Sequence, residues 1–312
     1  MHTETRAGIE VFALSSSIAE SSAEIVPAWG NNCVSFRAPA PVLDPLPFAE
    51  LEARPTSSGN PILFPFPNRV SGGVLRFAGE SYPVSPPRHG LVRDKPWNVI
   101  GRGASDSEGA WLRCAIEAGD FRREILDQFP FPFRLEVTYR LIDRRLEMET
   151  VVRNHGDAAL PFGFGIHPYF VRPTRGALTV PAAKRWELAD SLPTGRLLAV
   201  RGGYDLRQPR DVNELDLDDV FDELTPGPDG CARSSLRDED AGREIVVSSD
   251  VRDFPSIVVY TPPAPRRAVC IEPYTCPTDA FNLTARGIDG RLIVLGPGAS
   301  RTFRITIEAR RL

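Results

Sequence analysis

Apolar and polar residues alternate with a period of two along much of the chain. In Phe133–Leu141 the odd positions are apolar or aromatic and most even positions are polar, and Phe303–Ala309 repeats this pattern. Because side chains alternate between the two faces of a strand, both runs predict strands with one buried face. Leu146–Val152 also alternates and follows the first run after a short polar link, which predicts an antiparallel hairpin.

Further strand-like runs occur throughout the chain, separated by turns rich in Gly and Pro. They are Gly8–Leu14, Ala110–Ala118, Glu244–Ser249, Ser256–Tyr260, Ala268–Glu272 and Arg291–Leu295. Helical periodicity is confined to Pro47–Arg54 and to part of Asp211–Leu224. Many short strands without a dividing linker predict an all-β fold, a large antiparallel β-sandwich, with residues 1–312 in a single domain.

Composition narrows the class of protein. Of the 312 residues, 42% are hydrophobic and 25% are charged, which is typical of a globular chain, and 30 prolines disfavour long helices. The balance of 37 Lys and Arg against 41 Asp and Glu gives a net charge of −4. A nucleic-acid-binding surface needs a basic face, so we expect no nucleic-acid partner.

Lysine and cysteine usage excludes further chemistry. Lys95 and Lys184 are the only lysines, and Lys95 precedes Pro96, so a lysine-dependent aldolase is disfavoured. The five cysteines are scattered and form no CxxC pair, which predicts buried thiols rather than disulfides or a metal site. The first residues resemble no secretory signal and no apolar run could span a membrane, so we expect a cytoplasmic protein without a membrane partner.

Two histidines lie in unusual surroundings. His89 follows a Pro-rich segment and precedes Gly90, whereas His167 lies among aromatic residues. Pro168 favours an extended backbone at His167, and the glycines at positions 163 and 165 permit close approach of another chain or a ligand. Aromatic rings beside polar groups suit a sugar ring. A histidine in this setting can also be a hydrogen-bonded core residue, and both interpretations stay open here.

Two other segments carry candidate binding and catalytic groups. Asn68 and Arg69 end a proline-stiffened apolar stretch, where the guanidinium could present its donors to hydroxyl groups. Glu272 ends an apolar run directly before Pro273, and burial there would raise its pKa toward the range of a general base. A structural ion pair between Glu272 and an arginine is the alternative.

The seven acids of Asp211–Glu223 are a third candidate. A calcium-binding loop needs acids at fixed alternate positions and a central glycine, and this segment has no glycine. We therefore expect an exposed acidic loop or helix.

The order of these motifs resembles the aldose 1-epimerase (galactose mutarotase-like) family over about residues 60 to 283. The matching segments are Asn68–Val70, Phe77–Tyr82, His89–Gly90, His167–Phe170, Asp218–Phe221 and Glu272–Thr275. The resemblance implies a β-supersandwich fold. It also implies an isomerase that interconverts the α and β anomers of a free aldose.

The resemblance also assigns catalytic roles. Glu272 matches the general base that takes the proton of the C1 hydroxyl, and His167 matches the general acid that protonates the ring oxygen. His89 matches a second histidine that binds the sugar near the ring oxygen.

Substrate-binding roles follow in the same way. Arg69 and either Asp218 or Asp219 match residues that hold sugar hydroxyls, and we expect Asn68 and Arg93 beside them. Ring opening moves only protons, so no metal or organic cofactor is expected, and the sequence contains no dinucleotide or phosphate-loop motif.

Three alternatives remain. A hexose-6-phosphate mutarotase would use the cations Arg88, Arg93 and Lys95 near His89 to bind the phosphate. A non-catalytic carbohydrate-binding or regulatory protein could keep the fold and bind a sugar without reaction. A glycoside hydrolase would pair Glu272 with Asp218 or Asp279. The sequence identifies neither the natural sugar nor the oligomeric state, which is a monomer or a homodimer.

Overall fold

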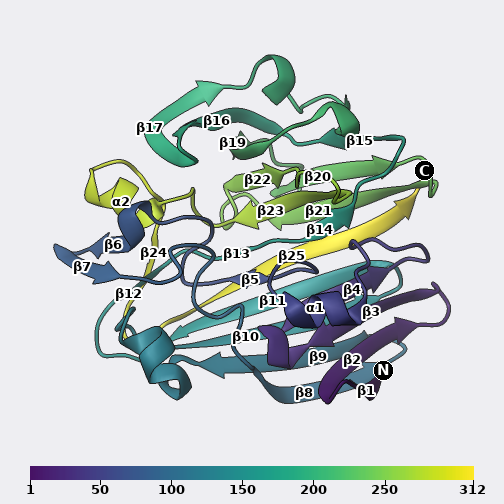
Figure 1. Cartoon of the computed structure of the whole chain (residues 1–312), viewed down its shortest axis with the longest axis horizontal. Helices are drawn as coiled ribbons and strands as arrows, with labels where there is room; N and C mark the ends of the chain where they lie inside the picture. Colours follow the sequence, from purple (N-terminus) through teal and green to yellow (C-terminus); the bar gives the residue numbers. More distant parts are fainter.

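The computed structural model describes residues 1–312, and all its strand ladders are antiparallel (Figure 1). A nine-stranded sheet and an eight-stranded sheet contain most of the strands. This architecture confirms the predicted all-β sandwich. The two α-helices have six residues each, and no helix is long and apolar enough to cross a membrane.

The nine-stranded sheet has the order β18-β15-β20-β21-β25-β11-β10-β9-β8. Its strands are β8 (Asn98–Ser105), β9 (Gly109–Glu117), β10 (Phe133–Ile142), β11 (Arg145–Asn154), β15 (Gly176–Thr179), β18 (Arg210–Asp211), β20 (Cys231–Asp238), β21 (Arg243–Asp250) and β25 (Ser300–Arg311). The long C-terminal strand β25 crosses the middle of the molecule in Figure 1.

The eight-stranded sheet has the order β17-β16-β19-β22-β23-β13-β5, and β14 also pairs with β23. Its strands are β5 (Ile62–Leu63), β13 (Gly165–Ile166), β14 (Tyr169–Val171), β16 (Ala182–Ala189), β17 (Leu192–Ala199), β19 (Asp218–Leu224), β22 (Ser256–Tyr260) and β23 (Ala268–Tyr274).

Smaller elements complete the molecule. The N-terminal segment forms a four-stranded sheet, and two two-stranded sheets and two helices lie outside the large sheets. These elements are β1 (His2–Arg6), β2 (Ile9–Ser16), β3 (Ser21–Val26), β4 (Asn32–Arg37), β6 (Val74–Phe77) with β7 (Glu80–Pro83), β12 (Leu160–Phe162) with β24 (Ile293–Leu295), α1 (Phe48–Ala53) and α2 (Ala280–Ala285).

The two faces of the eight-stranded sheet have different roles. Ile257, Val259 and Ile271 belong to the main core of 64 buried residues. Their neighbours Val258 and Tyr274 point to the opposite face and belong to a separate small cluster. Because successive side chains of a strand alternate, one face of this sheet is fixed in the core and the other is left for a site.

The alternating patterns were sound predictors of strands. The predicted hairpin is β10–β11, in which Leu141 pairs with Leu146, and all the other predicted strands overlap observed ones. The predicted helix Pro47–Arg54 corresponds to α1. All five cysteines are free thiols and four of them are buried.

The prediction of an exposed loop or helix for the acidic segment Asp211–Glu223 was wrong for its second half. Residues 212–217 form a 3-10 turn and a loop in which Glu214 and Asp216 are exposed, whereas the following residues form strand β19 between β16 and β22. Asp222 is fully buried, where its carboxylate contacts the Arg291 guanidinium at 2.8 Å and accepts a hydrogen bond from Trp186 Nε1 at 2.9 Å. Backbone pairing on both sides and the partly buried Arg291 guanidinium thus outweigh the charge pattern.

Replacement of Gly90 tests how tightly the loop before β8 is held. Gly90 has φ +72°, and a Cβ there would lie 2.2 Å from the backbone oxygen of Phe64. We expect Gly90→Ala to lower the free energy of unfolding by about 3 kcal/mol or more, since clash and backbone strain add. Urea unfolding measures the change.

Gly72→Ala is the matched control for that measurement. Gly72 also has a positive φ, +61°, but a Cβ there would meet no atom within 4 Å. Its cost should be about 1 kcal/mol, from the backbone alone. Equal losses in the two variants would contradict close packing of Gly90 on Phe64.

Candidate active site

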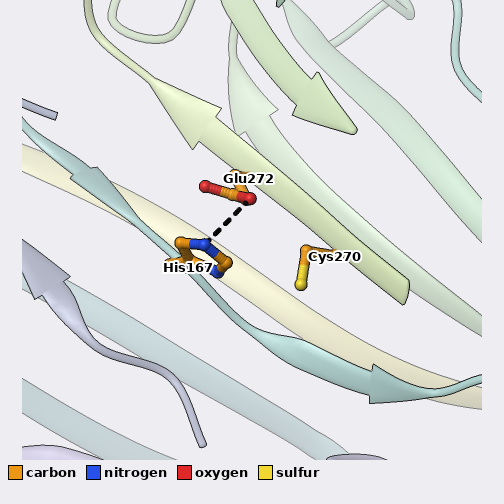
Figure 2. A group of neighbouring side chains, drawn as sticks. All are labelled: His167, Cys270 and Glu272. Atoms are coloured by element: carbon orange, nitrogen blue, oxygen red, sulfur yellow. Dashed lines mark ion pairs between the residues drawn. The ribbon is translucent and has the colours of Figure 1, made fainter. Parts of the chain in front are cut away.

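The register of β23 against its two short neighbours brings His167 and Glu272 together. Gly165 of β13 pairs with Tyr274, and Tyr169 of β14 pairs with Cys270. His167 lies midway between Gly165 and Tyr169 in sequence, and Glu272 lies midway between Cys270 and Tyr274. The antiparallel register therefore places His167 and Glu272 opposite each other. Their side chains meet on one face of the sheet, with His167 Nε2 3.4 Å from Glu272 Oε1 (Figure 2).

A glycine makes this arrangement possible. A Cβ on Gly165 would lie 2.4 Å from Cδ1 of the Tyr274 ring, so only glycine lets that ring lie across β13. Tyr274 then donates a hydrogen bond from its hydroxyl to Glu272 Oε2 at 2.5 Å. The expected close approach at the glycine beside His167 is therefore a contact that orients the carboxyl group.

Glu272 is buried without a full counter-charge. Its side chain is 1% exposed, and it contacts His167 and Tyr274 rather than an arginine. Burial raises the pKa of Glu272 well above its ordinary value, because the charged form loses hydration, and the Tyr274 hydrogen bond opposes this only in part. Burial therefore favours the protonated form of this carboxyl group, and its Oε1 faces Nε2 of His167, with which it can exchange a proton.

His167 is held between an aromatic ring and the carboxyl group. Its imidazole stacks on Tyr169 with ring centroids 4.5 Å apart and planes 14° apart. Its backbone N–H donates to the oxygen of Pro61 at 3.0 Å. Burial, together with the smaller effect of nearby arginines, Arg93 first among them, lowers the pKa of His167 to about 3. The ring is thus neutral in the empty site, with Nε2 directed at Glu272.

His89 lies perpendicular to His167 on a rigid loop. The ring centroids are 5.2 Å apart and the planes 77° apart. His89 has φ +63°, and its backbone N–H donates to the oxygen of Asn68 at 2.7 Å. Burial, the neighbouring His167 and three arginines lower the pKa of His89 well below its ordinary value. His89 is therefore a neutral hydrogen-bonding group at this position.

Arg69 and Asp218 form one wall of the site. The Arg69 guanidinium contacts Asp218 Oδ2 at 3.2 Å and donates to Asn68 Oδ1 at 3.1 Å. Asp218 pairs with Tyr260 in the sheet, which places it on the Glu272 face. Asp219 points to the other face, where it contacts Arg185 at 3.4 Å. The structure thus brings Asp218, and not Asp219, to the site.

These residues surround a cavity of about 170 Å³. The cavity brings together all seven predicted site residues: Asn68, Arg69, His89, Arg93, His167, Asp218 and Glu272. Asp279, a carboxylate considered for a hydrolase, lines other hollows and not this one.

Sequence reasoning missed several residues of the cavity. Tyr169 and Tyr260 supply aromatic surface, and Thr56 and Ser57 supply hydroxyls from the segment after α1. Tyr169 could have been found from its spacing, because it lies two residues after His167 and so shares its face of the sheet. Nothing in the sequence around Thr56 distinguishes it from other polar loop residues.

We expect the imidazole of His167 to stay neutral when the pH is lowered from about 8 to about 5. Its lowered pKa, about 3, means that protonation begins only well below histidine's ordinary value of 6.5. Nitrogen-15 chemical shifts of the histidine rings measure this, with His167→Gln to assign the signal. A midpoint near 6.5 for this ring would contradict its burial in the site.

Comparison with known proteins places this geometry in a family. The chain resembles YihR, an uncharacterized protein of Escherichia coli K12, with 25% identity over 83% of this chain and 82% of YihR. The Slr1438 protein of Synechocystis sp. PCC 6803 has a similar structure, with a TM-score of 0.79 and 26% identity over 97% of this chain and 96% of the other.

A galactose mutarotase-like protein from Clostridium acetobutylicum is also similar. Its TM-score is 0.88, covering 100% of this chain and 98% of the other at 20% identity, which shows a shared fold. The sequence model of the aldose 1-epimerase family matches residues 16–308. The chain therefore belongs to the aldose 1-epimerase family.

Proposed function

We propose that this protein is a mutarotase, an isomerase that interconverts the α and β anomers of an aldose. The contact that carries the proposal is the one between His167 Nε2 and Glu272 Oε1, 3.4 Å apart at the buried floor of the cavity. Glu272 acts as the general base and His167 as the general acid. His89 and the Arg69–Asp218 pair hold the sugar.

The closeness of the two groups suits the reaction. In a cyclic aldose the anomeric hydroxyl oxygen and the ring oxygen are both bonded to C1. A base acting on the first and an acid acting on the second must therefore be immediate neighbours. The pair meets this requirement because His167 and Glu272 lie opposite each other in the sheet register.

The proton balance of the pair also fits. Glu272 takes the proton of the C1 hydroxyl while C1–O5 breaks, and the bond's electrons go to O5, which receives a proton from His167. Rotation about C1–C2 presents the other face of the aldehyde, and the reverse transfers close the ring. One proton on the pair suffices for the whole cycle. Burial favours the form with that proton on Glu272, and its transfer from Oε1 to Nε2 of His167 would give the carboxylate and the imidazolium that the first step uses.

The other considered activities fit less well. A hydrolase would need a second free carboxyl group beside Glu272, but the cavity's other carboxylate, Asp218, is already paired with Arg69 at 3.2 Å. A purely sugar-binding protein would have no use for a buried acid and base in direct contact. Burial of such groups costs stability, which a reaction explains and binding does not.

Glu272→Gln is the direct test of the general base. The amide keeps the size of the side chain but accepts no proton, so we expect mutarotation to slow by about 10²–10⁴-fold. Anomer exchange of aldoses followed by NMR measures the rate. Glu108→Gln, at a carboxylate that is 64% exposed, is the control and should match the wild type.

Two results would count against the proposed function. If the folded Glu272→Gln protein equals the wild type, Glu272 is not the base. If the wild type is no faster than buffer on a broad panel of aldoses, the sugar-binding alternative replaces the enzyme. Circular dichroism and thermal unfolding establish that each variant is folded.

Two unpaired arginines favour a particular substrate class, an aldose with an acidic group. Arg88 and Arg93 line the cavity beside the two histidines, and neither is within ion-pair distance of a carboxylate. Asp94, next to Arg93, contacts Lys95 instead, at 3.1 Å. Burial and the like charge of Arg88 lower the pKa of Arg93. An anionic group of the substrate would supply the missing counter-charge.

The anionic-substrate proposal predicts an effect that depends on substrate charge. We expect kcat/KM for glucose 6-phosphate or glucuronate to exceed that for glucose, and Arg93→Gln to reduce the two anion values by about tenfold or more. The value for glucose should change much less. Phosphate and carboxylate substrates in parallel show which anion is preferred.

Arg122→Gln, at an arginine that is 83% exposed and outside the cavity, controls for a general loss of positive charge. Equal losses of kcat/KM for glucose and for the anions in Arg93→Gln would overturn the anionic-substrate proposal. The proposed mutarotation itself would survive that result.

A further inference from the structure

We propose that the floor of the cavity also binds a zinc ion through His167, Cys270 and Glu272, and that zinc thereby inhibits the enzyme reversibly. Inhibition rests on the proposed function, whereas zinc binding does not. The site is formed by side chains that the backbone already places together.

The sheet register explains why a thiol joins the pair. Cys270 lies two residues before Glu272 in β23, so both side chains point to the same face. Cys270 also pairs with Tyr169, which shares its face with His167. The three potential ligand atoms all lie within 4.8 Å of one another, and all three residues are buried (Figure 2).

The donor set suits zinc. Imidazole nitrogen, thiolate sulfur and carboxylate oxygen are its usual ligands, and three protein ligands leave a fourth tetrahedral position for water. That position would open to the cavity that His167 and Glu272 line. Zinc would displace one proton from the thiol of Cys270 and, where Glu272 is protonated, one from its carboxyl group, and both would pass to solvent.

The outer contacts of the three residues indicate moderate affinity. Oε2 of Glu272 is held by the Tyr274 hydroxyl, which leaves Oε1 free for a metal. Nδ1 of His167 is buried without a hydrogen-bond partner, whereas a zinc-bound histidine usually donates from its second nitrogen. We therefore expect an exchangeable ion that a chelator removes, rather than one required for folding.

Cys270 has no part in proton transfer, so it separates the two roles of the site. It makes no hydrogen bond and packs against Tyr169, Tyr260 and Ala268. Zinc on Nε2 of His167 and on Glu272 would occupy the two groups that exchange protons with the sugar. Loss of the thiol should therefore lower the affinity for zinc more than it lowers the rate of mutarotation.

The experiment titrates zinc into the full-length, metal-free protein by calorimetry. We expect binding of one ion per chain in the wild type and an affinity lowered by about tenfold or more in Cys270→Ser. Cobalt is the spectroscopic probe, and its thiolate charge-transfer band should be present in the wild type and absent in Cys270→Ser. In parallel, zinc inhibition is measured for each protein against its own metal-free rate, and EDTA should reverse it.

Cys231→Ser is the matched control, since Cys231 is the half-buried thiol and lies near Asp229. The proposal is overturned if Cys270→Ser binds zinc as the wild type does, or if the cobalt band depends on Cys231. Should Cys270→Ser fail to fold, His167→Gln replaces it, and unchanged zinc affinity in that variant overturns the proposal. A wild type without mutarotation would contradict the proposed function while leaving the binding test intact.

Discussion

The structure of the site depends on one constraint, the antiparallel register between β23 and the broken pair β13 and β14. Each two-residue step along β23 is matched by a two-residue step in the opposite direction on its partner. Tyr274, Glu272 and Cys270 therefore meet Gly165, His167 and Tyr169 in turn, all on one face. A shift of this register by one residue would turn Glu272 into the core and abolish its contact with His167.

The two faces of the eight-stranded sheet serve different purposes: one stabilises the fold and the other carries the site. One face packs Ile257, Val259 and Ile271 into the main core, which fixes the backbone. The other face carries polar groups that cost free energy to bury, and the rigid core beneath lets it hold them in place. The loops over the cavity are fixed similarly, since His89 and Gly90 are tied to the Asn68 and Phe64 backbones.

Much of the fold could be predicted from the chain because alternation is a local property. In Phe133–Leu141 the alternation of apolar and polar residues alone indicates which side chains are buried, without knowledge of distant segments. Asp222 shows the limit of that reasoning. It looks like part of a solvated acidic run, but its environment is supplied by Arg291 and Trp186, which lie far away in the sequence.

The residues of the site also differ in how far the sequence alone could identify them. Glu272 and His167 could be singled out by their neighbours in sequence, and the choice between Asp218 and Asp219 could not be made. That choice depends on which residue of β22 each one pairs with, and only Asp218 pairs on the Tyr260 face. The sequence likewise did not indicate that Cys270 is part of a group of metal-ligand residues. Metal-site motifs are recognised by their spacing in sequence, and its neighbour His167 comes from a distant segment of the chain.

The charges of the cavity would link substrate binding to the proposed proton transfer. Burial lowers the pKa of both histidines most, and Arg93 and Arg88 lower it as well, so in the empty site these arginines oppose the protonated imidazole that the proposed ring opening needs. An anionic group lying between these arginines would cancel part of their field and raise the pKa of His167. The imidazole would then become a better proton carrier when substrate is in place. The arginines would thus contribute to the rate as well as to affinity, because their effect on His167 differs between the empty and the occupied cavity.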